Sequence, residues 1–127
     1  MRWLSRAIIM ALHHESIARY GGADGIRDEG LLESALGRPL NLSAYDPEAS
    51  IFDLAAYYCA GVVKNHPFVD GNKRTGLLAA RTFLTLNGID FEPDDAETVV
   101  MIEGLAAGTY DEDTIARWLE SNSAQLR

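Results

Sequence analysis

The chain has 127 residues, of which 47% are hydrophobic and 24% charged, so we expect residues 1–127 to form one globular domain with its own core. The formal net charge of −8 argues against direct binding to nucleic acid or to an anionic membrane surface, because both demand clustered Lys and Arg. No apolar run approaches the roughly 18 residues of a membrane span, and the N-terminus lacks the long apolar region of a signal peptide, so we expect a cytoplasmic protein.

Apolar residues recur at helical spacing in the first half of the chain. They predict a helix over residues 5–19 with Ser5 as its N-cap, which a run of glycines then ends. A short helix over residues 28–37 follows. We expect Gly37 to cap this helix and Pro39 to forbid its continuation, with an irregular connection up to residue 50.

The second half of the chain predicts four more helices and no convincing strand. Their expected spans are 51–64, 72–87, from Asp94 or Asp95 to 107, and from Asp111 to 121. Residues 89–91 are at most a short extended piece. The helix over 72–87 is apolar in most directions, which predicts that it lies at the centre of the bundle. The predicted fold class is therefore all-α, a compact single-domain bundle of about six helices around a buried central helix.

The chemically distinctive segment leads into this central helix and reads His-Pro-Phe-Val-Asp-Gly-Asn-Lys-Arg-Thr over residues 66–75. Gly71 lets a ligand approach the main chain, and the first amides of the helix that follows form a potential anion site. Lys73 and Arg74 lie at the end of the helix where the dipole disfavours cations. A polyanion such as a phosphate chain supplies the compensation that these two residues need.

Two further side chains of the segment indicate group transfer. Asp70 is placed to hold Mg²⁺ beside bound phosphates, and His66 is a candidate general base near neutral pH. Taken singly, an ordinary loop, turn and helix cap explain such residues, but their combination favours phosphoryl or nucleotidyl transfer to a hydroxyl. From Lys64 to Arg81, four cations and one acid give a local charge of +3, which favours a small anionic ligand and adds Lys64 to the phosphate-binding candidates.

This segment resembles the signature of the Fic/Doc family, His-x-Phe-x-Asp/Glu-Gly/Ala-Asn-x-Arg ahead of a buried helix. The resemblance extends to residues 12–22 and 25–28, which are similar to the opening of the Doc-type ("death on curing") toxins of toxin–antitoxin systems, and it covers nearly the whole chain. It implies that His66 deprotonates the target hydroxyl, that Asp70 holds Mg²⁺ and that Phe68 anchors the loop in the core. The phosphate ligands that it implies are Gly71, Asn72, Lys73 and Arg74.

Two departures from the adenylylating Fic enzymes favour a kinase reaction. Those enzymes have Gly at the position of Lys73, and at the position of Leu77 they have a second Arg that grips the γ-phosphate. Doc-type members share the Lys and lack this Arg, and they bind the nucleotide the other way round. The resemblance therefore implies transfer of the ATP γ-phosphate to a Ser or Thr hydroxyl of a translation factor such as elongation factor Tu, with growth arrest as the outcome. Transfer of AMP or another nucleotidyl group is the alternative reaction.

The chain also lacks the inhibitory motif of many Fic enzymes, because the spacing from Thr98 to Glu103 is one residue too long. The resemblance then implies restraint by a cognate antitoxin protein whose disordered tail folds on binding. Arg19 is a candidate contact for this antitoxin or for the ligand, although a cation at a helix C-terminus is an equally good explanation of it. A non-catalytic antitoxin-binding module is the other alternative, which would not need His66 and Asp70.

The adjacent His13 and His14 cannot form a metal-binding pair, because neighbouring residues point to different faces of a helix. We interpret both as surface or packing residues.

Overall fold

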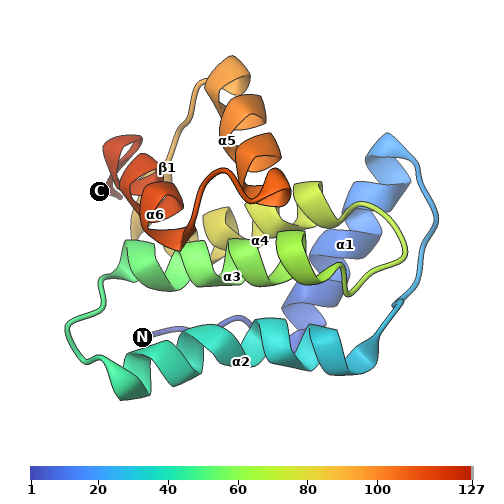
Figure 1. Ribbon diagram of the computed structural model, residues 1–127, viewed down its shortest axis with the longest axis horizontal. Helices are drawn as coiled ribbons and strands as arrows, with labels where there is room; N and C mark the ends of the chain where they lie inside the picture. The colour runs from blue at the N-terminus through green and yellow to red at the C-terminus, as the bar shows by residue number, and fades with distance from the viewer. Residues whose placement is uncertain (127) are drawn as a thin grey trace.

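The computed structural model describes residues 1–126, which fold into an all-α bundle with one small two-stranded sheet (Figure 1). The elements in chain order are α1 (Arg6–Tyr20), α2 (Glu29–Tyr45), α3 (Ile51–Asn65), α4 (Asn72–Leu86), β1 (Ile89–Phe91), α5 (Asp95–Ala107), α6 (Glu112–Ser121) and β2 (Ser123–Gln125). No helix among these residues has both the length and the apolar character needed to cross a membrane.

Helices α3 and α4 form the centre of the bundle. Helix α3 packs against α2, α4, α5 and α6, and α4 also contacts α1 and β1 (Figure 1). The core aromatic rings lie between these elements: Phe83 of α4 stacks on Trp3 with ring centroids 5.9 Å apart and contacts Tyr58 of α3 at 5.1 Å. The central position expected for the helix after the motif loop is confirmed, although α3 shares it.

Three of the predicted helix starts agree with the structure because each of them is set by a local capping contact. Ser5, Asp94 and Asp111 each precede a helix and accept a hydrogen bond from a main-chain amide in its first turn. The structure thereby selects Asp94 over Asp95 as the cap of α5.

The predicted end of α2 is wrong. This helix does not end near Gly37 but continues through Pro39 to Tyr45, so most of the expected irregular connection is helical. Proline inside a helix costs one main-chain hydrogen bond and strains the preceding turn. Here tertiary packing outweighs that cost, because Leu32, Ala35 and Pro39 are buried together on the face of α2 that packs on α3.

The short extended piece at residues 89–91 is confirmed as β1, but its partner was not predicted. Strand β2 pairs with β1 in antiparallel register, with Asp90 opposite Ala124. Phe91 ends β1 in the core, where its ring and that of Trp118 pack in a T-shaped arrangement with centroids 5.2 Å apart. The pairing fastens the segment after α6 against the end of α4.

Candidate active site

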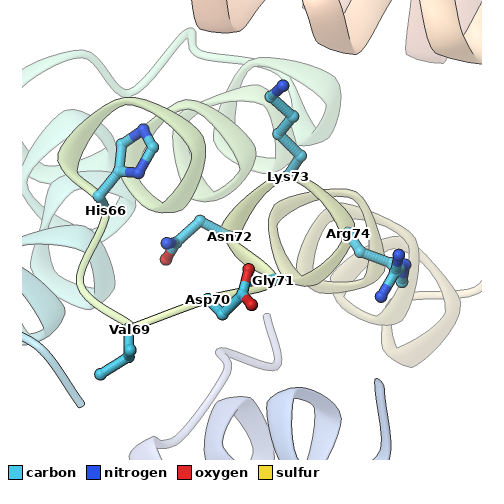
Figure 2. Close-up of a pocket in the computed structure, with 7 residues that line it drawn as sticks. All are labelled: His66, Val69, Asp70, Gly71, Asn72, Lys73 and Arg74. Atoms are coloured by element: carbon cyan, nitrogen blue, oxygen red, sulfur yellow. The ribbon is translucent and has the colours of Figure 1, made fainter. Parts of the chain in front are cut away.

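The motif segment forms a loop between α3 and α4 and lines a pocket of about 300 Å³. Its lining residues are His66 and residues 69–74, so the structure brings together six of the seven candidates for catalysis, metal and phosphate (Figure 2). His66 lies at one side of the pocket, and Lys73 and Arg74 leave the first turn of α4 in different directions (Figure 2). The seventh candidate, Lys64, belongs to α3 and does not line this pocket.

The loop is held from within by Phe68 and Asn72. The side chain of Phe68 is fully buried, as the resemblance implied. Asn72 is also buried, and its side-chain amide binds the main chain of Phe68 at both ends: Oδ1 accepts from the Phe68 amide, and Nδ2 donates to the Phe68 oxygen, both at 3.0 Å. The side chain of Asn72 therefore shapes the loop, and its main-chain amide is the group left to meet a phosphate.

The segment between α1 and α2 runs along the motif loop (Figure 1). It also holds the carboxylate of Asp70. The amide of Ala23 donates to Asp70 Oδ2 at 3.2 Å, and the amide of Gly71 donates to Oδ1 at 2.9 Å. The two segments approach so closely that a Cβ on Gly22 would lie 2.8 Å from Asp70 Oδ2. Residue 22 therefore has room only for glycine beside this carboxylate.

His13 lies underneath the loop, so packing is the observed one of the two roles considered for it, and its contact with the loop was not predicted. Its imidazole is fully buried, stacks on the ring of Phe68 with centroids 3.9 Å apart, and places Nε2 2.8 Å from the main-chain oxygen of Asp70. A carbonyl oxygen only accepts, so Nε2 carries the proton of this hydrogen bond. The available signal in the sequence was the spacing, because His13 lies four residues after the apolar Ile9, as core residues of a helix do.

Asp24 joins the two histidines of α1 to the neighbouring turn. His14 Nδ1 lies 3.1 Å from Asp24 Oδ2, and His13 Nδ1 lies 3.6 Å from Oδ1. The hydrogen bond from His14, followed by that from the amide of Gly25, holds the pKa of Asp24 below its usual value. These contacts fix the turn around Asp24 to α1, and the motif loop contacts this turn through the hydrogen bond from the Val69 amide to the Gly25 oxygen.

Helix α4 begins without a side-chain cap. Its N-cap position is Gly71, with φ at 75°, whereas each of the other five helices in residues 1–126 has a Ser or Asp cap. A Cβ at Gly71 would also lie 3.1 Å from the Ile17 side chain, so glycine is needed there for both angle and space. The first turn of α4, which has no side-chain cap and carries the positive end of the helix dipole, lines the pocket.

The two cations of this turn already have partners. Lys73 Nζ lies 3.1 Å from both carboxylate oxygens of Glu103 on α5, and the guanidinium of Arg74 lies over the ring of Tyr20 at 4.3 Å. Both pairs are at the surface, where such contacts are weak enough to exchange for a bound anion.

Two predicted cations lie outside the pocket. Lys64 pairs with Glu112 of α6 at 2.8 Å, and this geometry gives no support to a phosphate-binding role for it. Arg19 lines a separate hollow of about 230 Å³ between α1 and α4, together with Arg74 and Arg81. Leu77 lines that hollow and also a neighbouring one of about 310 Å³ along α5.

The residues of the pocket fit Mg²⁺ that enters with a nucleotide. Asp70 is exposed, and each of its oxygens accepts one amide hydrogen bond, which leaves lone pairs for a cation. Within residues 1–126, no group of three or more His, Cys, Asp and Glu side chains is arranged to hold a metal ion. A single carboxylate suits Mg²⁺ when phosphate oxygens and water complete its shell.

Comparison with known proteins found one family model and two relatives that match the chain. The model of the Fic/DOC family matches residues 3–84, a span that includes α1, the motif loop and most of α4. Protein kinase doc of Escherichia phage P1 is 35% identical over 116 residues, which cover 91% of each chain. Toxin Doc of Mycolicibacterium smegmatis is 38% identical over 110 residues, which cover 83% of each chain.

Proposed function

This chain belongs to the Fic/DOC family, and from that membership we propose that it is a Doc-type toxin that transfers the γ-phosphate of ATP to a protein hydroxyl. The observation that carries the proposal is the convergence of His66, Asp70 and the uncapped start of α4 on one pocket. A base, a metal-binding carboxylate and an anion cradle are the parts that phosphoryl transfer requires. Because β2 pairs with β1 and α6 packs on α3, we treat residues 1–127 as one Fic/Doc-like domain.

Each part has its own role in this proposal. His66 accepts the proton of the attacking Ser or Thr hydroxyl, which makes the oxygen a better nucleophile. The phosphates bind to the main-chain amides after Gly71 and to Lys73 and Arg74. Asp70 holds Mg²⁺, which neutralises phosphate charge and orients the nucleotide when it is bound.

Two features favour phosphorylation over nucleotidyl transfer. The long side chain of Lys73 leaves the first turn of α4 where the adenylylating enzymes have glycine (Figure 2). Leu77 presents an apolar side chain to the hollows beside α4, so it cannot grip a terminal phosphate. The relative from phage P1 is named a protein kinase, which agrees with this choice. We further propose that the acceptor is a translation factor similar to elongation factor Tu, and hence that the chain acts in the cytoplasm to arrest growth.

The proposed partner is an antitoxin with a disordered tail. The two hollows beside α4 carry Arg19, Arg74 and Arg81 together with apolar side chains such as Leu77. An acidic, amphipathic segment that folds on binding matches this combination of charge and apolar surface. Arg19 is then an antitoxin contact, outside the chemistry of the pocket.

The test is a transfer assay on a bacterial lysate and on purified elongation factor Tu. ATP is labelled in separate tubes at the α- or γ-phosphate, with Mg²⁺ present or removed by chelation. We expect label only from the γ-position, only with Mg²⁺, and none with His66→Ala. Asn41→Ala is the control, because it truncates an exposed polar residue of α2 that does not line the pocket.

Other results of this assay would redirect the assignment. Label from the α-position would make the chain a nucleotidyl transferase and would contradict the roles given to Lys73 and Leu77. No transfer from either position, with toxicity retained by His66→Ala in cells, would favour a non-catalytic antitoxin-binding module.

A further inference from the structure

The backbone at His66 has an unusual conformation. His66 has φ of 51° and ψ of 56°, and among residues 1–126 it is the only non-glycine residue with a positive φ. It follows the last residue of α3, a position that glycine normally occupies, because a Cβ disfavours left-handed backbone. Such a conformation persists only where the surroundings enforce it.

Arg27 supplies that enforcement from the segment between α1 and α2. Its Nε donates to the main-chain oxygen of His66 at 2.6 Å, and its Nη2 donates to the oxygen of Asn65 at 2.8 Å. The main-chain amides of Arg27 and Asp28 both donate to the oxygen of Pro67, at 2.7 and 3.1 Å. Arg27 and Asp28 therefore bind three successive carbonyl groups, those of residues 65–67.

The chemistry of the arginine side chain matches these acceptors. The carbonyl groups at the end of α3 have no partners within the helix and carry the negative end of its dipole, which a cation stabilises. A planar guanidinium reaches two oxygens at once in fixed directions, which a lysine ammonium does not do. Ile26, the residue before Arg27, forms a β-bridge with Phe68 of the motif loop. The main chain that carries the guanidinium is therefore itself fixed to the loop.

We propose that Arg27 is a positioning residue that holds the imidazole of His66 in the orientation needed to take the proton from the acceptor hydroxyl. Arg27 does not line the pocket and acts only through the main chain of Asn65 and His66. This inference rests on the proposed function, in which His66 is the base. It makes the α1–α2 connection part of the catalytic apparatus, although no residue of it is in the motif.

The test compares Arg27→Ala and Arg27→Lys with Arg6→Ala. Arg6 is a matched control, because it is also an exposed arginine and does not line the pocket. It pairs at 2.8 Å with Glu29, the first residue of α2. For Arg27→Ala we expect kcat for γ-phosphate transfer to fall roughly 10- to 100-fold, while KM for ATP changes less than about twofold. We expect the kcat of Arg27→Lys to lie between those of Arg27→Ala and the wild-type protein, and Arg6→Ala to keep the wild-type kcat.

A residue that only stabilises the fold would give a different pattern of stability and kcat from a positioning residue. We expect Arg27→Ala to remain folded by circular dichroism, and guanidinium chloride at non-denaturing concentration to restore part of its kcat. An unchanged kcat in Arg27→Ala, or equal losses in Arg27→Ala and Arg6→Ala, would overturn the inference.

Nuclear magnetic resonance separates failure of this inference from failure of the proposed function. If the wild-type protein transfers no γ-phosphate, the proposed function fails, and the backbone of His66 still reports on Arg27. We expect the amide–Hα coupling and the Cα shift of His66 to indicate left-handed backbone in the wild-type protein and in Arg6→Ala. They should move away from those values in Arg27→Ala, and unchanged values there would show that Arg27 does not set this conformation.

Discussion

The Nε2 atom of the buried His13 lies 2.8 Å from the main-chain oxygen of Asp70. Helix α1 thereby supports the pocket from below, at the residue proposed to hold Mg²⁺. The same imidazole is stacked on Phe68, so a single side chain contacts both the anchor of the loop and its carboxylate residue.

Replacing His13 separates the hydrogen bond from the packing. His13→Phe keeps an aromatic ring against Phe68 but has no donor for the Asp70 oxygen, whereas His13→Gln offers an amide donor of similar reach. We expect His13→Phe to remain folded and to lose roughly 10- to 100-fold in kcat, and His13→Gln to recover part of that loss. Initial rates of γ-phosphate transfer and thermal unfolding measure the two effects. Equal rates for His13→Phe and the wild-type protein would mean that the packing alone matters.

The ion pair between Lys73 and Glu103 competes with a bound phosphate for the same ammonium group. Both side chains are about half exposed, at 47% and 59%, so the pair is screened by solvent and salt. Glu103→Gln removes the competitor, and we expect ATP to bind roughly two- to fivefold more tightly at low ionic strength, with less gain at high salt. Isothermal titration calorimetry with Mg²⁺ and ATP measures this change.

Glu112→Gln is the control for that titration, because it removes the carboxylate partner of another lysine, Lys64 of α3. We expect no change in ATP affinity, since Lys64 does not line the pocket. Tighter binding by Glu112→Gln would restore Lys64 to the phosphate ligands that the sequence predicted.

The parts of the fold that depend on neighbouring residues were predictable. Ser5, Asp94 and Asp111 cap helices through contacts three residues away, so their effect is visible in the sequence. Pro39 was misread because its tolerance depends on the packing of α2 against α3, which the local sequence does not encode. Strand β2 was missed for the same reason, since it exists only through pairing with β1.

In the site, too, the residues that are neighbours in the sequence were predictable, and the contacts between distant residues were not. The motif loop is contiguous, so its residues and their chemistry were predicted together. His13 and Arg27 act on that loop from 57 and 39 residues away. Helical spacing indicates that His13 is buried, but nothing near either residue indicates which carbonyl group it binds. Long-range hydrogen bonds to main-chain carbonyl groups do not depend on the side chains of the loop, so the loop's residues could not have indicated them.

Asn72 gives a test of how the loop keeps its shape. Asn72→Asp preserves the size of the side chain and the acceptor for the Phe68 amide, but it replaces the donor to the Phe68 oxygen with a second oxygen. Because the group is buried, we expect the free energy of unfolding to fall by about 1–3 kcal/mol and phosphate transfer to be largely lost. Urea denaturation followed by tryptophan fluorescence measures the stability.

Asn41→Asp is the control for this substitution, because it adds the same negative charge at an exposed position of α2. We expect its stability and activity to stay near the wild-type values. If Asn72→Asp is as stable as this control, the bidentate contact with Phe68 does not hold the loop.

Cys59 lies in the core of α3, where burial raises the pKa of its thiol from 9.0 to about 12. Below pH 9 the thiol is protonated in both the folded and the unfolded chain, so it adds no pH dependence to stability. As the pH rises from 9 towards 12, the unfolded chain loses this proton first, and the free energy of unfolding falls.

At about pH 10.5 we expect the free energy of unfolding to be lower by about 2 kcal/mol than at about pH 8 because of this thiol, and Cys59→Ala to abolish this difference. Urea denaturation of both proteins at the two pH values measures the difference, and Tyr58, whose pKa is also raised by burial, contributes equally to both. The same pH dependence in Cys59→Ala as in the wild-type protein would mean that the thiol is not the group responsible.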